Sequence, residues 1–165
     1  MIGLVLLILK ENLLMKMQID DIIHHARNRE YMSGVDRDKL RVKATGEVFT
    51  PIALVNEVLN QLPQELFSDP TKTFIDPSCG DGQFLSEVLI RKLENGIEFE
   101  TALSTIYGVE LMEDNVKLCR ERLLCNREDL RHIVEKNIVQ ADSLEYKYMF
   151  GEPEVFGNGN FYIEQ

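Results

Sequence analysis

One aspartate and two glycines near the middle of the chain are the residues whose types and spacing best suit ligand chemistry. Asp76 follows a short β-prone run, and Gly80 and Gly82 come shortly after it. A carboxylate at the end of a strand can accept hydrogen bonds from amino or hydroxyl groups, and glycines let the backbone turn tightly and let a ligand approach. A strand, a glycine turn and a helix in this order are typical of nucleotide-type sites in α/β proteins.

The stretch after the turn predicts a helix over residues 83–95, because its apolar residues recur at helical spacing. Gly96 follows as the expected C-terminal cap. The two glycines do not form the dinucleotide fingerprint, since that pattern needs a third glycine where this chain has Leu85. The turn therefore points to a different class of nucleotide-like ligand.

The elements that position these residues alternate along the chain. Helices are predicted over 17–32 and 52–62, the second with Thr50 as its N-cap and Pro51 at its first position. Strands are predicted at 73–75, 105–111 and 138–141, and further helical segments at 99–103 and 114–125, the latter capped by Asp114 and Asn115. This alternation favours parallel strands joined by right-handed crossovers, and hence an α/β fold with a partial parallel sheet.

Length and composition predict one compact domain. The chain has 165 residues, of which 44% are hydrophobic, and no apolar run is long enough to cross a membrane. We expect residues 1–45 to form an N-terminal helical segment and connector, and residues 46–165 to form the ligand-binding domain. Its three cysteines lack metal-ligand spacing, which favours reduced thiols and a cytoplasmic setting.

The charge is uneven and mostly acidic. Residues 1–43 carry eight Lys and Arg against six Asp and Glu, whereas the rest of the chain carries ten against 22. A surface that binds DNA is expected to be basic, because phosphate contacts supply much of the affinity. The best local candidate is the basic stretch 37–43, whose alternative interpretation is a solvated connector.

The amino-acid sequence of the turn resembles that of a known protein family. The string Asp-Pro-Ser-Cys-Gly-Asp-Gly-Gln-Phe-Leu at 76–85 resembles the first motif of S-adenosylmethionine (SAM)-dependent adenine-N6 DNA methyltransferases, including those of restriction-modification systems and phages. A Gly-x-x-x-Thr-Pro segment at 46–51 resembles the motif that precedes it in that family. The resemblance implies the three-layer, Rossmann-like fold of class I SAM methyltransferases, with SAM as the cofactor.

The resemblance also implies which residues hold SAM. Thr50 and Pro51 would fold over its methionine end, Asp76 would hydrogen-bond its amino group, and Phe84 would pack beneath the turn. Glu110 would grip the ribose hydroxyls, with Leu111 or Met112 on the adenine face, and Asp142 would meet the adenine amino group. The remaining expected cofactor contacts are Ser78, Gly80, Asp81, Gly82 and Ser143.

The catalytic half of the family pattern is missing. Adenine-N6 methyltransferases carry Asn/Asp-Pro-Pro-Tyr/Phe, which binds the target amino group and stacks on the flipped base. The nearest string here is Gly-Asn-Gly-Asn-Phe, which offers Asn158 and Phe161 as candidate catalytic residues but replaces both prolines. Because glycine is far more flexible than proline, a rigid array of carbonyls is not expected there.

Several interpretations therefore stay open. The chain is expected to be the SAM-binding half of an adenine DNA methyltransferase, meeting DNA through a partner chain. The alternatives are a catalytically inactive SAM-binding or protein-interaction module, an enzyme for another amino substrate, and a nucleotide-binding protein unrelated to SAM. A sheet with an unfinished edge also predicts a homo- or hetero-oligomer joined at that edge, unless residues 160–164 or 4–9 add a strand there.

Overall fold

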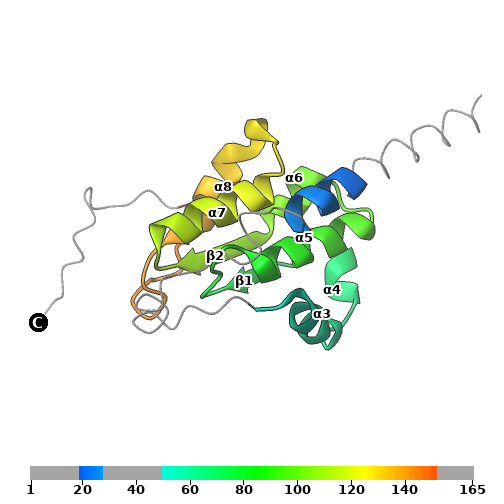
Figure 1. Cartoon of the computed structure of the whole chain (residues 1–165), viewed down its shortest axis with the longest axis horizontal. Helices are drawn as coiled ribbons and strands as arrows, with labels where there is room; N and C mark the ends of the chain where they lie inside the picture. The colour runs from blue at the N-terminus through cyan, green and yellow to red at the C-terminus, as the bar shows by residue number, and fades with distance from the viewer. Residues whose placement is uncertain (1–18, 28–49, 152–165) are drawn as a thin grey trace, which may run out of the picture.

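Three short parallel strands form the centre of the computed structural model, which describes residues 19–27 and 50–151 (Figure 1). The strands are β1 (Phe74–Asp76), β2 (Ile106–Glu110) and β3 (Ile138–Gln140), and they lie in the order β1-β2-β3. Phe74 pairs with Ile106 and Gly108 with Ile138, and both ladders are parallel. The predicted α/β class with parallel strands is confirmed.

Helices α5 (Gln83–Glu94) and α7 (Glu113–Leu124) cover one face of this sheet (Figure 1). Gly108 on β2 faces them, since a Cβ there would lie only 2.8 Å from Cys79 Sγ and 2.9 Å from Leu85 Cδ1. The main core lies in this layer, and its fully buried apolar residues include Leu89, Ile106, Cys119, Leu123, Leu124 and Ile138. The predicted helix over 83–95 is confirmed, and Gly96 follows it with a positive φ.

The end of the sheet where β2 and β3 begin is closed by further helices. These are α6 (Phe99–Ser104), a 3₁₀ turn (Glu128–Leu130) and α8 (Arg131–Asn137). Buried Asn137 donates from Nδ2 to the carbonyl of Ser104 at 3.3 Å, which ties α8 to α6. The α6 helix matches the predicted segment 99–103, whereas the 3₁₀ turn and α8 were not predicted.

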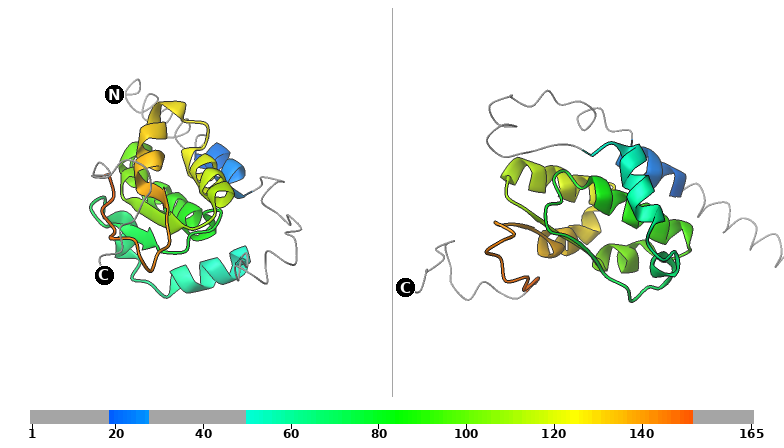
Figure 2. Two further views of the ribbon diagram at one scale, coloured as in Figure 1. Left: turned by 90° about the vertical axis from the view of Figure 1, so that its left-hand side faces the viewer. Right: turned by 90° about the horizontal axis from the view of Figure 1, so that it is seen from below.

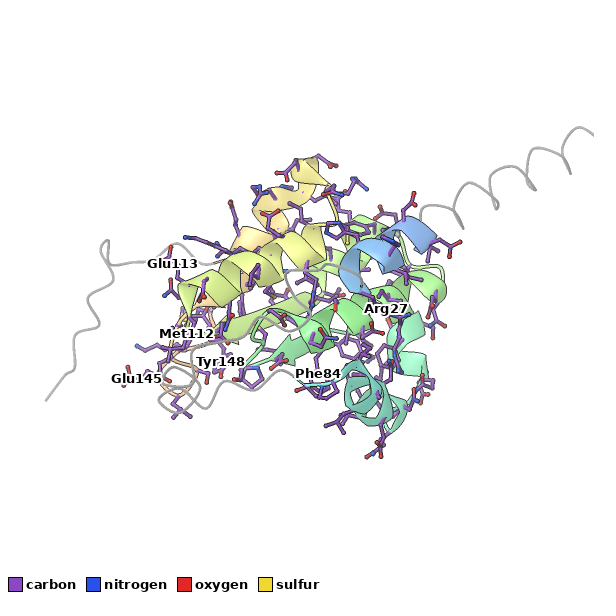
Figure 3. All side chains as sticks on the ribbon, viewed as in Figure 1. Arg27, Phe84, Met112, Glu113, Glu145 and Tyr148 are labelled. Carbon is purple, nitrogen blue, oxygen red and sulfur yellow. The ribbon has the colours of Figure 1, made fainter. Side chains whose placement is uncertain are left out.

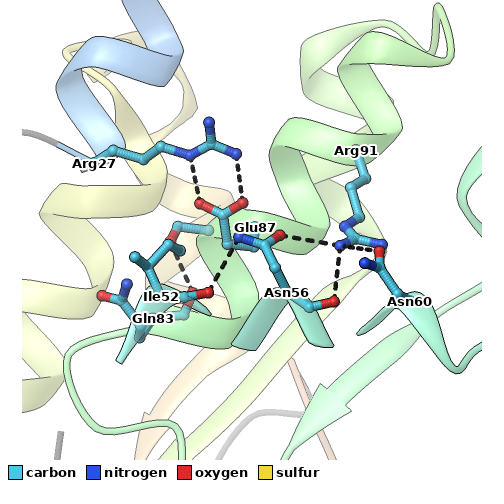
Figure 4. A network of polar contacts seen from close by, with 8 residues as sticks. Arg27, Ile52, Asn56, Asn60, Gln83, Glu87 and Arg91 are labelled. Carbon is cyan, nitrogen blue, oxygen red and sulfur yellow. Dashed lines mark hydrogen bonds and ion pairs between the residues drawn. The ribbon is translucent and has the colours of Figure 1, made fainter. Parts of the chain in front are cut away.

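Helix α3 (Ile52–Asn60) packs on α5 and is followed by the short, unpredicted α4 (Glu65–Ser68). Arg91 of α5 binds α3 by donating to the side-chain oxygens of Asn56 at 3.0 Å and Asn60 at 2.8 Å (Figure 4). The predicted cap is wrong by one residue: Pro51 is the N-cap, with ψ 142°, and its carbonyl accepts from Leu54 and Val55. Thr50 therefore precedes the cap.

A second predicted cap also differs. Met112, not Asp114 or Asn115, is the N-cap of α7, and its carbonyl accepts from the N–H of Val116 at 3.0 Å. The helix begins at Glu113, one residue before the predicted start, and the Met112 N–H donates to Glu110 Oε1 at 2.8 Å. Asp114 and Asn115 consequently lie inside the first turn.

Residues 19–27 are helical and pack against α5 and α7 (Figure 2). Arg27 donates from Nε and Nη2 to the two carboxylate oxygens of Glu87 on α5, at 2.7 and 2.6 Å. His25 Nε2 lies 3.2 Å from the carbonyl of Glu121 on α7, whereas His24 is exposed. The rest of the helix predicted over 17–32, and the domain boundary expected near residue 45, lie outside the described residues.

The other face of the sheet carries exposed apolar and aromatic groups. Ile75, the middle residue of β1, is 51% exposed, and Tyr107 beside it on β2 packs on Phe150 with ring centroids 4.9 Å apart. Tyr146 and Tyr148 complete this aromatic cluster, which folds back from the segment after β3. Among the described strands, β1 has β2 as its one neighbour. Within the described part of the chain, no helix is long and apolar enough to span a membrane.

Candidate functional site

The backbone between β1 and α5, residues 77–82, forms a tight glycine turn. Gly80 and Gly82 have φ values of 53° and 87°, in the left-handed region that favours glycine. The turn is pinned to β2 because Cys79 N–H donates to the carbonyl of Val109 at 3.0 Å, and it closes on itself through the N–H of Gly82 and the carbonyl of Cys79 at 2.8 Å. Its shape is thus determined by hydrogen bonds within the protein.

Gly80 and Gly82 differ in what surrounds them. A Cβ on Gly82 would lie 2.7 Å from Cys119 Sγ, so this glycine allows the turn to sit against α7. A Cβ on Gly80 would meet no atom within 4 Å, so this glycine borders open space. Hydrogen bonding with Cys119 and burial raise the pKa of the Cys79 thiol, which keeps this buried cysteine neutral beneath the turn.

A small hollow of about 130 Å³ opens over the turn. It is lined by residues from the segment before α3, the end of β1, the turn and the start of α5: Thr50, Asp76, Ser78, Cys79, Gly80, Asp81, Gln83 and Phe84. Most of the expected contacts for the methionine end of SAM therefore meet in one place. Ligand pockets usually have volumes of roughly 300–1,000 Å³, so the hollow has room for one end of such a ligand.

Asp76 at the end of β1 is the acid that faces this hollow. Its Oδ1 accepts from the N–H of Ser78 at 3.0 Å, which orients the carboxylate at the start of the turn. Burial raises the pKa of Asp76, the nearby charge of Glu110 adds to the rise, and the hydrogen bond from Ser78 opposes it. A positively charged group bound in the hollow would stabilise this buried carboxylate.

Glu110 at the end of β2 is buried, with 9% of its surface exposed, and does not stand free at the strand end. Its Oε2 accepts from the N–H of Gly80 at 3.0 Å and its Oε1 from the N–H of Met112 at 2.8 Å. Buried Asn115 also donates from Nδ2 to Oε1, at 3.5 Å. Since each carboxylate oxygen has about two lone-pair positions, Oε2 is the oxygen that retains an acceptor site among these contacts. Leu111 beside it is 56% exposed, and Met112 lies at the same end of the molecule (Figure 3).

Asp81 in the turn is also buried, at 3% exposure, although it borders the hollow. Its Oδ1 accepts from Nη1 of Arg122 on α7 at 3.3 Å, and Gln83 Oε1 accepts from the same nitrogen at 2.7 Å. Burial lowers the pKa of Arg122, and the charge of Asp81 opposes that change. The sequence predicted Asp81 as a cofactor contact, whereas no role was predicted for Arg122.

Asp142 and Ser143 lie just beyond β3, at the edge where the three strands finish. Asp142 is exposed, and its Oδ1 accepts from the N–H of Leu144 at 2.9 Å in a local turn. The N–H of Ala141 donates to the carbonyl of Glu110 at 3.0 Å, so this turn begins beside Glu110. The Ser143 carbonyl accepts from the Tyr148 hydroxyl at 2.8 Å (Figure 3).

The candidate catalytic residues Asn158 and Phe161 lie outside the described residues. Within 19–27 and 50–151, no three His, Cys, Asp or Glu side chains gather as a metal site. The polar groups that do converge belong to the turn and to the ends of the parallel strands. That is the part of an open α/β sheet where ligands bind.

Comparison with known proteins identifies this arrangement. The family model described as N-6 DNA Methylase matches residues 38–155, which is well over half of the chain and includes the glycine turn and the ends of all three strands. The chain belongs to the N-6 DNA methylase family. Members of this family use SAM as the methyl donor, so the family agrees with the chemistry that the turn indicates.

A curated relative gives the same assignment. The chain is 29% identical over 103 residues to the Type II methyltransferase M.VspI of Vibrio sp. (strain 343), a match that covers 62% of this chain and 22% of the relative. The match thus spans about a fifth of the length of that methyltransferase. No solved structure matches the chain.

Proposed function

We propose that this N-6 DNA methylase family chain binds SAM at the glycine turn and serves as the cofactor-binding part of an adenine-N6 DNA methyltransferase. The observation that carries the proposal is the convergence of Asp76, Gly80 and Glu110. The ends of β1 and β2 hold two carboxylates on either side of a glycine that borders open space. Members of the N-6 DNA methylase family use SAM, a ligand whose amino and hydroxyl groups suit these carboxylates.

The residues around the hollow fit the methionine end of SAM. Its ammonium group would pair with the Asp76 carboxylate, whose pKa is raised by burial and by the charge of Glu110 and which a positive charge would therefore stabilise. Thr50 and Pro51 precede α3, and Thr50 lines the hollow, so they would close over this end of the ligand. Ser78 and Gly82 would shape the turn, and Phe84, partly buried against the core, would support it from below.

The other end of the ligand would extend along the strand ends. Glu110 Oε2 retains an acceptor position for a ribose hydroxyl, and Oε1 would accept a second hydroxyl in place of the long 3.5 Å contact from Asn115 Nδ2. Leu111 and Met112 would contact one side of the adenine ring, and Asp142 with Ser143 would meet its polar edge. Bound here, SAM supplies an electrophilic methyl group, while the residues of this chain bind and orient its donor and exclude water from the buried side.

We further propose that methyl transfer needs a partner polypeptide, which meets the chain at the open edge of β1. Parallel sheets are normally covered on both faces, yet Ile75 on β1 is half exposed, beside Tyr107, which packs on Phe150 of the aromatic cluster. Leu54, Val58 and Leu62 add exposed apolar groups at helical spacing on and just after α3. The partner would add strands to the sheet and supply the groups that bind the adenine base and the DNA.

Isothermal titration calorimetry with SAM tests the first proposal. Asp76→Ala should weaken binding, because a charge-assisted hydrogen bond is worth about 1.5–3 kcal/mol, or roughly 10- to 150-fold in affinity. Glu110→Gln should also weaken it, by removing the charge that holds the ribose. Asp129→Ala is the matched control, since this exposed acid pairs with Arg127 away from the turn. Equal affinities for all four proteins would refute the assigned contacts.

A methyl-transfer assay tests the second proposal. The chain, tritiated SAM and adenine-containing DNA would be incubated with and without the products of neighbouring genes. We expect label in DNA when a partner is present, and none with this chain alone. Transfer by the isolated chain would refute the need for a partner. SAM binding without transfer under any combination would instead favour a catalytically inactive SAM-binding module.

A further inference from the structure

Arg122 joins α7 to the glycine turn. Its side chain is 3% exposed, and its Nη1 donates to Asp81 Oδ1 at 3.3 Å and to Gln83 Oε1 at 2.7 Å. Asp81 lies between the two glycines of the turn, and Gln83 is the first residue of α5. A single guanidinium therefore contacts both sides of Gly82.

The backbone on either side of this contact has a conformation that needs support. Gly80 and Gly82 both have positive φ, and glycine gains no rigidity from a side chain of its own. Gly82 also sits against Cys119, three residues before Arg122 on the same helix. Two residues of α7 thus contact the turn: Cys119 packs against Gly82, and Arg122 forms an ion pair with Asp81.

Two acids, Asp81 and Glu87, act on the charge of Arg122. Glu87 is on α5, one helical turn beyond Gln83, and Arg27 of the helix at residues 19–27 donates to both of its carboxylate oxygens, at 2.7 and 2.6 Å (Figure 4). Arg122 contacts Asp81 directly through Nη1. Arg27 therefore ties the N-terminal helix to α5, and Arg122 ties α7 to the turn.

We propose that Arg122 is a positioning residue for the cofactor: by holding Asp81 and Gln83 it fixes the backbone of residues 80–82 in the shape that receives SAM. The inference rests on the proposed SAM-binding function. Asp81 then contributes through Arg122, because its carboxylate is turned to the guanidinium, and the N–H of Gly80 remains directed at Glu110. Loss of Arg122 would leave the turn in several conformations, of which few match the ligand.

The test combines SAM titration with a measurement that needs no ligand. Arg122→Met removes the guanidinium but strands a buried carboxylate, so the second variant is Arg122→Met with Asp81→Asn, which removes the unpaired charge and favours folding. Arg122→Lys retains a charge without the planar fork. Arg120→Met is the matched control: this arginine is on the same helix but donates to the carbonyls of Ile138 and Glu135.

We expect SAM to bind the double variant at least tenfold more weakly than it binds the unaltered chain, with Arg122→Lys between them and Arg120→Met within twofold. Amide hydrogen exchange without ligand should be faster at Gly80 and Gly82 in the double variant, and unchanged there in Arg120→Met. A folded double variant with unaltered SAM affinity would overturn the proposal. If the unaltered chain binds no SAM, the proposed function fails, and the exchange rates alone decide whether Arg122 orders the turn.

Discussion

The two faces of the sheet differ in how completely the described chain covers them. The face toward α5 and α7 is packed with fully buried residues such as Leu89 and Cys119, and two of its buried acids, Glu87 and Asp81, pair with arginines. The opposite face buries Val109 but leaves Ile75 half exposed, near an aromatic cluster from the segment after β3. The cofactor turn belongs to the packed side, so the part proposed to bind SAM is structurally self-sufficient, whereas the part proposed to meet the substrate is not.

The largest expected difference is between a leucine buried in the packed face and an exposed leucine in the turn after β3. Leu89→Ala on α5 should lower the free energy of unfolding by about 2–5 kcal/mol, because it leaves a cavity in the core. Leu144→Ala, at a leucine with 94% exposure, should change it by no more than about 0.5 kcal/mol. Urea denaturation measures both. Similar losses for the two variants would mean that Leu89 does not lie in a tightly packed core.

The next largest effect concerns the turn. Gly82→Ala and Gly96→Ala both force an alanine into the left-handed region, but a Cβ at Gly82 also meets Cys119 whereas one at Gly96 meets nothing within 4 Å. We expect Gly82→Ala to be the more destabilising by about 1–3 kcal/mol, the usual cost of overpacking. Adding Cys119→Ala should recover part of this excess. Thermal or urea denaturation of the three variants measures these differences. Equal destabilisation by Gly82→Ala and Gly96→Ala would contradict the tight packing of the turn against α7.

Asp76 should make SAM binding depend on pH. Its pKa is raised above the ordinary value of 3.8, so the carboxylate takes up a proton, and loses its hold on the ammonium group, at a higher pH than an ordinary aspartate would. Affinity should therefore fall as the pH drops through this raised pKa. The same raised pKa means that Asp76 favours folding below its unfolded pKa and that this contribution is lost as the pH rises through the folded value.

Calorimetry over a pH series, with Asp76→Asn as the control, measures this dependence. The asparagine variant should bind SAM weakly, with an affinity that stays flat over the acidic range. A parallel decline in both proteins would assign the titration to another group.

The smallest effect on stability should come from the open edge. Ile75→Ser replaces a half-exposed side chain and should change the free energy of unfolding by about 0.5 kcal/mol or less. It should nevertheless weaken association with the partner, because it removes an apolar group from the proposed contact surface. Light scattering and pull-down with the partner measure association. A monomeric chain at high concentration that also captures no partner would remove the edge as an interface, and a second copy of the chain seated there would identify a homodimer.

The strands, α5 and α7 were predictable because hydrophobic spacing and glycines mark them locally. The short α4 and the 3₁₀ turn carry too few residues for a periodic signal. Helix α8 was missed although buried Leu130, Ile133 and Val134 have helical spacing, since charged residues dilute the pattern. The cap was misplaced by one residue at α3 and by two at α7, where Pro51 and Met112 take the capping position through backbone contacts.

In the candidate site, contacts within a motif were predictable from the sequence, whereas contacts between distant residues were not. The hollow brings together Thr50, Asp76 and the turn as their motifs indicate. The pairing of Asp81 with Arg122 was not predictable, because an arginine among polar helix residues looks like a solvated one in the sequence. It becomes buried through contact between residues 41 positions apart. The hydrogen bonds from Gly80 and Met112 to Glu110 depend in the same way on the assembled sheet.

The central claim is that the glycine turn of this chain binds SAM without help from another polypeptide. Isothermal titration calorimetry of the purified chain with SAM tests it most directly. The structure predicts saturable binding of one SAM per chain, weakened by at least tenfold in Asp76→Ala and unchanged in Asp129→Ala. The absence of any heat or thermal shift at millimolar SAM, in a chain shown to be folded, would contradict it.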